Sequence, residues 1–200
     1  VWYRSLEIPI FENNFEYLSS EFKCIENFIK KYLECKEKGN FESCRKKVLS
    51  DFRSEEILFE MRLEESKEKI FSMALYMKRK CRLSKLEWFA LMLAVMMEFD
   101  QNYKELILKV ENSNNLTYNA ILKLYFFTHD ISEIENSCDV LAVCKEKLNY
   151  FFFVDGVPKI DPRIYDNLIN NSQNKIKIPG VSLSPVNNRF KKPLTIREET

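Results

Sequence analysis

The hydrophobic positions near the start of the chain repeat with the period of an α-helix. Between Asn14 and Lys36 apolar side chains recur in steps of three and four, separated mainly by Glu, Lys and Asn. Gly39 and Asn40 then predict a helix end, because glycine adopts the left-handed conformation at little cost. The spacing predicts one long amphipathic helix, whose apolar seam is Phe15, Leu18, Phe22, Ile25, Ile29 and Tyr32.

The pattern continues with further helical segments up to residue 82. A short helix is expected over Cys44–Phe52, and Ser54 with the two acids that follow it is typical of a new helix start. Apolar positions then recur from Ile57 to Met77 around a charged stretch, which we interpret as a solvated helix face. Residues 1–82 are therefore predicted to form a helical hairpin or a small bundle.

A different helical pattern begins at Leu83. Ser84 and Glu87 fit the capping box, in which the Ser and Glu side chains satisfy each other's backbone N–H groups. The apolar run Trp88–Met97 that follows is much shorter than the ~20 residues that cross a bilayer. It predicts a buried core helix, which ends at the acidic pair formed by Glu98 and Asp100.

Two more helices and a hairpin are expected after this core helix. One helix begins near Gln101, and the next is capped by Thr117 and ends at His129–Asp130, before a possible capping box at Ser132–Glu135. The aromatic run Tyr150–Val154 is followed by Asp155-Gly156, a favoured hairpin turn.

The return strand of this hairpin is predicted over Val157–Ile160, and Pro158 restricts it to a sheet edge. Asp161 and Pro162 then predict the start of a final helix that reaches Ile169. Beyond Asn170 the periodicity ends, and Pro and Gly are spread among Asn, Ser and Lys.

Three helices followed by a hairpin is the order of a winged helix. The sequence predicts a mainly α protein with an N-terminal helical hairpin or bundle (1–82). A winged-helix-like domain with one small β-hairpin (83–170) and an extended linker (171–200) are expected to follow.

Composition supports a helical core and argues against a strongly charged partner. The chain is 46% hydrophobic and 14% aromatic, and its three Gly favour long helices over tight turns. Lys and Arg total 31 against 30 Asp and Glu, a net charge of +1. This balance gives no overall attraction to nucleic acid or to an anionic membrane. No secretory signal is visible at the N-terminus.

The candidate chemistry of the chain is sparse. The six Cys have no C-x-x-C spacing and His129 is the only His, so no metal site is predicted. We interpret the thiols as reduced and mostly buried in a cytoplasmic protein, with a disulfide framework as the alternative. These cysteines are Cys24, Cys35, Cys44, Cys81, Cys138 and Cys144.

No catalytic or cofactor-binding residue is predicted. His129 beside Asp130 is typical of a helix end, and neither Cys138 nor Cys144 has the partner pattern of a nucleophile. None of the Gly residues belongs to the Gly-Lys-Ser/Thr loop that cradles phosphates. This chain alone is therefore expected not to bind or hydrolyse ATP.

Three stretches resemble the N-terminal region of a group of bacterial AAA+ ATPases. The first is Leu83-Ser84-x-x-Glu87 with its apolar helix, Glu98-Phe99-Asp100 and Tyr103; the others are Leu116–Leu124 and Ile160–Leu168. In that family a helical segment and a winged helix precede the ATPase module. The resemblance implies that such a module, with ATP and Mg²⁺ and in a ring oligomer, follows Thr200 in a longer parent protein. The first residue, Val1, agrees with a trimmed chain.

Two functions remain open at this stage. The preferred one is non-catalytic: an accessory region that recognises a protein partner or regulates a remodelling motor. Its expected docking surface draws on the aromatic side chains, which exceed what one small core hides. That surface comprises Tyr118, Lys123, Tyr125, Phe126 and Phe152. The alternative is a nucleic-acid-binding winged helix, for which the helix after Thr117 offers only Asn119 and Lys123.

Overall fold

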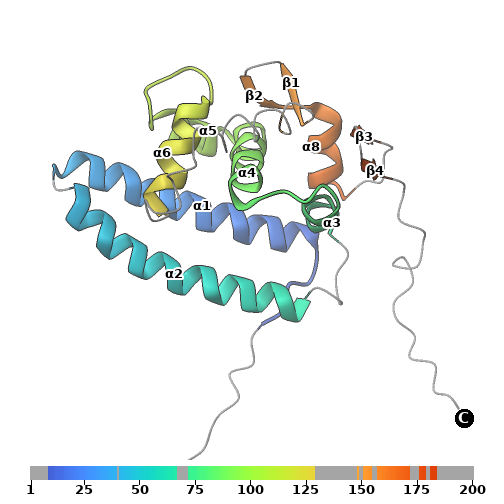
Figure 1. Ribbon diagram of the computed structural model, residues 1–200, viewed down its shortest axis with the longest axis horizontal. Helices are drawn as coiled ribbons and strands as arrows, with labels where there is room; N and C mark the ends of the chain where they lie inside the picture. Colours follow the sequence, from blue (N-terminus) through green and yellow to red (C-terminus); the bar gives the residue numbers. More distant parts are fainter. Residues whose placement is uncertain are drawn as a thin grey trace, which may run out of the picture.

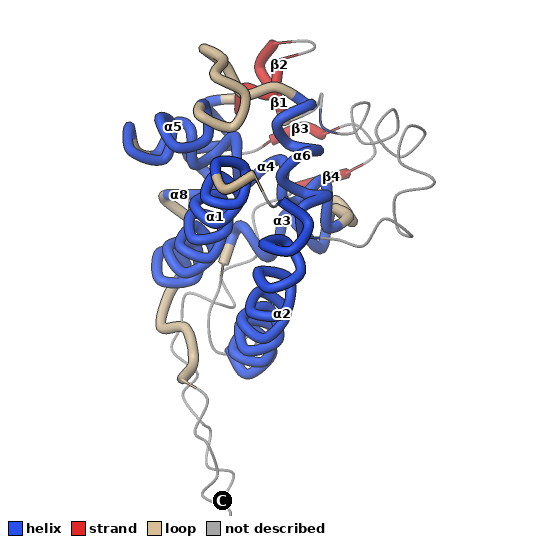
Figure 2. Tube along the Cα trace, turned by 90° about the vertical axis from the view of Figure 1, so that its left-hand side faces the viewer, coloured by secondary structure: helices blue, strands red, loops and turns tan. Residues whose placement is uncertain are grey.

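A computed structural model of the 200-residue chain describes residues 9–39, 41–66, 72–128, 148, 151–154, 157–171, 176–178 and 181–183. Helices make up most of this part, and its strands form two antiparallel two-stranded sheets (Figures 1 and 2). The prediction of a mainly α protein is therefore confirmed.

Helix α1 (Asn14–Glu37) is the long amphipathic helix that the spacing predicts. The Asn13 side chain caps its start by accepting the Glu16 backbone N–H, and Gly39 follows its end with a φ of +68°. Its buried face includes Tyr17, Phe22 and Phe28. Phe15, which the periodicity assigns to the seam, instead lies exposed on the first turn.

Helix α2 (Phe41–Ser66) returns along α1 as the second arm of a hairpin (Figure 1). It is one continuous helix, so the predicted break near Ser54 was wrong. The Ser54 hydroxyl donates to the Ser50 carbonyl one turn earlier instead of capping a new helix. Serine hydroxyls in helix interiors often satisfy themselves in this way.

A disulfide between Cys35 and Cys44 joins the two arms of the hairpin close to their turn. The prediction of reduced thiols was therefore wrong for this pair. The turn brings the two residues to a Cα–Cα distance of 5.5 Å, which lies in the range that a disulfide spans. Cys24 and Cys81 are free thiols, and Cys138 and Cys144 lie outside the described residues.

Of the next four described helices, the first has a start that sequence analysis did not predict, and the other three begin as predicted. Helix α3 (Met73–Lys80) is capped by Ser72, and α4 (Lys85–Phe99) has both hydrogen bonds of the Ser84–Glu87 capping box. Helix α5 (Gln101–Leu108) follows Asp100, which caps it. Helix α6 (Tyr118–Thr128) begins after Thr117, whose hydroxyl accepts the Ala120 N–H. The predicted helix end at 129–130 and the capping box at 132–135 lie outside the described residues.

The predicted hairpin is present as β1 (Phe152–Val154) and β2 (Val157–Ile160), which pair antiparallel. Its turn residues, 155 and 156, lie outside the described part. Helix α8 (Pro162–Ile169) follows, and the Asp161 side chain caps it by accepting the Arg163 N–H. Sequence analysis missed a second hairpin, β3 (Ile176–Ile178) with β4 (Val181–Leu183), in a stretch expected to lack regular structure.

The core is one continuous cluster of buried side chains from both sides of residue 83. Helix α1 lies at its centre, with α2 on one side and α5, α6 and α8 on the other (Figure 1). Helix α4 is the most apolar of the described helices, and Leu91, Met92 and Leu93 on it are completely buried. The domain division at residue 83 stays a prediction.

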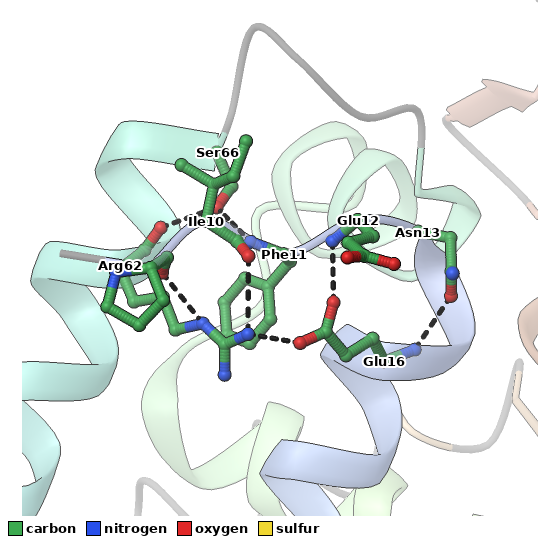
Figure 3. Close-up of polar contacts among 8 residues, drawn as sticks. Ile10, Phe11, Glu12, Asn13, Glu16, Arg62 and Ser66 are labelled. Carbon is green, nitrogen blue, oxygen red and sulfur yellow. Dashed lines mark hydrogen bonds and ion pairs between the residues drawn. The ribbon is translucent and has the colours of Figure 1, made fainter. Parts of the chain in front are cut away.

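A group of polar contacts holds the segment before α1 against the end of α2 (Figure 3). The Arg62 guanidinium donates to the carbonyls of Pro9 and Ile10 and pairs with the Glu16 carboxylate. It also lies 4.0 Å from the centroid of the Phe11 ring. These contacts hold the C-terminal half of α2 at a fixed position relative to the start of α1.

Candidate functional site

A groove with a volume of about 180 Å³ lies between α1, α2 and α4, and is partly open to solvent. Helix α1 contributes its middle turns, α2 forms a long wall, and α4 contributes its first turns. Lys78 of α3 and Tyr125 of α6 complete the lining. The apolar side chains of the groove are Ile25, Phe28, Phe52, Phe59, Leu63, Trp88, Phe89 and Tyr125.

The wall formed by α2 exists because this helix is apolar on two sides. Phe52, Phe59 and Leu63 fall on one side of a 3.6-residue helix and line the groove. Ile57 and Met61 fall on the opposite side and are exposed to solvent. Among the described residues of α2 only Arg45, Val48 and Ser66 are buried. The long α2 is therefore only lightly packed against the core, and its inner face remains partly accessible.

The floor of the groove is a set of packed aromatic rings. The Phe28 ring lies 5.4 Å from Phe52 and 6.3 Å from Phe89, measured between centroids. Phe89 in turn lies 6.0 Å from Tyr125. Aromatic pairs at such distances attract beyond the effect of buried area alone. These contacts hold the floor in place without a ligand, so the groove is preformed.

Charged side chains surround this apolar floor, and most of them are acidic. Glu21, Glu55, Glu56 and Glu60 line the groove together with Lys78 and Lys85. The Lys85 ammonium lies 3.1 Å from the Glu56 carboxylate and 4.0 Å from that of Glu60. Within the described part of the chain, Glu55 has no ion-pair partner.

Glu21 lines the groove from α1 and accepts a hydrogen bond from the Trp88 indole N–H. Burial raises the pKa of this carboxyl above 4.5, although the Lys78 ammonium and hydrogen bonds oppose the shift. Burial and the nearby Glu21 charge also raise the pKa of Tyr17 well above 10. The hydrogen bonds that favour the ionised form of Glu21 come from the Tyr17 hydroxyl and from the Trp88 indole N–H.

Lys78 and Cys24 border the same end of the groove. The Lys78 ammonium lies 5.1 Å from the centroid of the Trp88 ring, a favourable cation–π position. Burial, with the charges of Glu55 and Glu21, raises the pKa of the Cys24 thiol to about 11. The thiol is therefore protonated at neutral pH, whereas a nucleophilic cysteine needs a lowered pKa.

The five residues of the predicted docking surface do not meet in one place. Tyr125 lines the groove, and Phe126 is half-buried with its carbonyl accepting from Arg45. Phe152 is only 7% exposed and its ring packs near Tyr118, 6.4 Å away between centroids. Lys123 is exposed and donates to the Glu111 carboxylate at 2.7 Å. Only Tyr125 therefore contributes to the groove.

Sequence analysis missed the α2 wall of the groove. A signal for it is present in α2, where Phe52, Phe59 and Leu63 form one apolar stripe and Ile57 and Met61 form another. Two stripes are more than one core-facing side requires. Such a helix indicates an apolar face that the chain itself does not cover.

The Glu111 carboxylate binds the polar side chains on the first turns of α6. Its carboxylate accepts hydrogen bonds from Lys123, Thr117 and Asn119. Burial works against ionisation here, yet these bonds hold the pKa of Glu111 below its usual value. Both polar side chains that sequence analysis considered for base recognition are thus bound to an acid.

No family model, curated protein or solved structure matches the chain. In the described residues, no three His, Cys, Asp or Glu side chains cluster in a way that could hold a metal ion. None of the helices described is both long enough and apolar enough to cross a membrane.

Proposed function

We propose that the chain is a non-catalytic region that recognises a protein partner, and that the groove beside α2 receives an apolar segment of that partner. The observation that carries this proposal is the preformed aromatic floor. It lies in a groove of about 180 Å³ that is partly open to solvent. Burial of large aromatic surfaces supplies most of the energy of protein interfaces.

The size of the groove favours a protein segment over a free small molecule. Pockets for drug-sized ligands typically hold about 300–1,000 Å³. A helix with its side chains is about 10 Å across, so only its anchoring side chains would enter a cavity of this volume. Amphipathic helices bind grooves in this way through residues spaced three and four apart.

The resemblance to AAA+ ATPases gives this proposal its biological setting. The order of α4, α5 and α6, the β1–β2 hairpin and α8 supports a winged-helix-like domain within this chain. In the parent protein that we propose, an ATPase module with ATP and Mg²⁺ follows and assembles into a ring. The chain would regulate that motor by partner binding. This role implies a cytoplasmic location. There the Cys35–Cys44 disulfide would be exposed to thiols that reduce such bonds.

The placement of Glu111 weighs against the nucleic-acid alternative. A recognition helix needs cationic and amide side chains that are free to reach phosphates and base edges. On α6, Asn119 and Lys123 are both bound to Glu111, whose carboxylate would repel a phosphate. The protein-recognition role is therefore the better supported proposal.

Trp88 provides a direct test, because its ring lines the groove. A Trp2→Phe substitution leaves Trp88 as the only tryptophan. We expect a saturable change in its emission with an amphipathic helical peptide that has an uncharged polar face. The same peptide with a scrambled order, which has no apolar stripe, is the control. No response to the amphipathic peptide would contradict the proposed function.

The proposed relation to AAA+ ATPases is tested separately, by the coding sequence of the longer parent protein. We expect the reading frame to continue past Thr200 into a Walker A motif, G-x-x-x-x-G-K-[ST]. A stop codon directly after Thr200 would contradict the AAA+ assignment. It would leave the groove and its binding test unaffected.

A further inference from the structure

We infer that the groove selects a basic amphipathic helix, one whose apolar stripe is flanked by Lys or Arg on the side that faces α2. The inference rests on the proposed function, because it assumes that an apolar segment of a protein enters the groove. It is carried by the charges around the groove and by their arrangement.

The first observation is the sign of the charge. Four glutamates and two lysines line the groove, a balance of two negative charges when all are ionised. The chain as a whole has a net charge of +1, so this negative patch is local to the groove. A partner with flanking cations is attracted to it, whereas an acidic amphipathic helix meets repulsion on the same surface.

The second observation is the position of the acids. Glu55, Glu56 and Glu60 all lie on the α2 wall, whereas the two lysines come from α3 and from the start of α4, and Lys85 reaches across to Glu56 and Glu60. The α2 edge therefore has three acids and one cation. The charge requirement is therefore one-sided. The partner's cations belong along the edge that contacts α2, and this asymmetry fixes which way the partner helix is rotated.

The third observation is that these three acids can be reached and that only one cation, Lys85, lies within ion-pair distance of them in the part of the chain that the structure describes. Glu60 is 62% exposed, and it lies at the limit of ion-pair distance from Lys85, 4.0 Å. Glu56 is 33% exposed and pairs with Lys85 at 3.1 Å, whereas Glu55 is exposed and has no ion-pair partner in the described part of the chain. Glu56 and Glu60 are one helical turn apart. Lys residues spaced by four on an adjacent helix match that separation.

Peptides of about 18 residues with one shared apolar face test the inference. Three versions carry Lys, Glu or uncharged polar residues beside that face, and each is titrated with the full chain while its fluorescence anisotropy is followed. We expect the Lys peptide to bind about tenfold more tightly than the Glu peptide, as two or three surface ion pairs predict. The preference should shrink at about 0.5 M salt, where charges are screened.

A charge reversal in the protein locates the effect. Glu55→Lys should weaken binding of the Lys peptide about fivefold, the loss expected for one or two surface ion pairs, and leave the uncharged peptide unaffected. Glu37→Lys is the matched control, since Glu37 is exposed at the end of α1 and does not line the groove. Circular dichroism spectra confirm that both variants fold.

The outcomes separate the two proposals. Equal affinity of the Lys and Glu peptides, or equal effects of Glu55→Lys and Glu37→Lys, would overturn the inference while the groove still binds the uncharged peptide. Absence of binding by all three peptides would overturn the proposed function as well.

Discussion

Replacing Arg45 with Met should destabilise the protein strongly, because this side chain joins α2 to the end of α6. Arg45 is 8% exposed. Its Nε donates to the Phe127 carbonyl at 3.3 Å, and its Nη2 donates to the Phe126 carbonyl at 3.0 Å. Both carbonyls belong to the last turn of α6, where backbone acceptors lack helical partners and cations are favoured.

The magnitude follows from these contacts. Hydrogen bonds from a charged donor contribute about 1.5–3 kcal/mol each, and we take the lower figure because the bond to Phe127 is long. The Glu42 carboxylate, 3.8 Å away and 70% exposed, adds little. Met preserves most of the apolar volume of the arginine stem. We therefore expect Arg45→Met to lower the free energy of unfolding by about 3 kcal/mol.

Urea denaturation followed by circular dichroism measures this loss, with Lys46→Met as the control on the same helix. Lys46 is exposed, so its replacement should change stability by less than about 0.5 kcal/mol. Arg45→Lys keeps the charge but not the two-pronged geometry, and should recover only part of the loss. If Arg45→Met costs no more than Lys46→Met, the assignment of Arg45 as the link between α2 and α6 is wrong.

Three further predictions concern the buried Glu21, the Cys35–Cys44 disulfide and the contacts of Arg62. Glu21→Gln should raise the free energy of unfolding at about pH 7 and give no gain at about pH 4, as pH-dependent urea denaturation will show. Burial raises the pKa of the folded carboxyl above 4.5, so the folded chain binds this proton more tightly and wild-type stability falls as pH rises. Reduction of Cys35–Cys44 should cost about 2–3 kcal/mol in the same assay, since the bond closes a loop with a sequence separation of 9; a Cys35→Ala variant should be insensitive to the reductant. Arg62→Ala should accelerate amide hydrogen exchange at Phe11, whose N–H donates to Ser66 at 2.7 Å, while exchange in the middle of α4 stays slow.

Elements determined by local interactions could be predicted from the sequence. The capping box of Ser84 and Glu87 and the Asp161 cap each involve residues within one turn of each other. The hairpin of β1 and β2 has a run of aromatic residues and a favoured turn in its sequence. Such features require no knowledge of what packs against them. The continuity of α2 through Ser54 is a local feature that was nevertheless missed, because a serine followed by two acids is equally typical of a helix cap.

Features that depend on tertiary packing could not be predicted. The Cys35–Cys44 bond depends on the angle between the two arms of the hairpin. The groove is still harder to predict from the sequence. It exists only because α2 lies against α1 and α6 without filling the space beside Trp88.

The most direct test of the central claim is contact quenching of Trp88 by a bound peptide. The Trp2→Phe chain is titrated with the Lys-flanked peptide carrying a nitroxide on its apolar face, and with the same peptide carrying it on the polar face. If the groove is the binding site, the apolar-face label quenches Trp88 emission saturably and the polar-face label quenches it weakly. Binding by anisotropy without quenching from either label would place the peptide elsewhere and contradict the account.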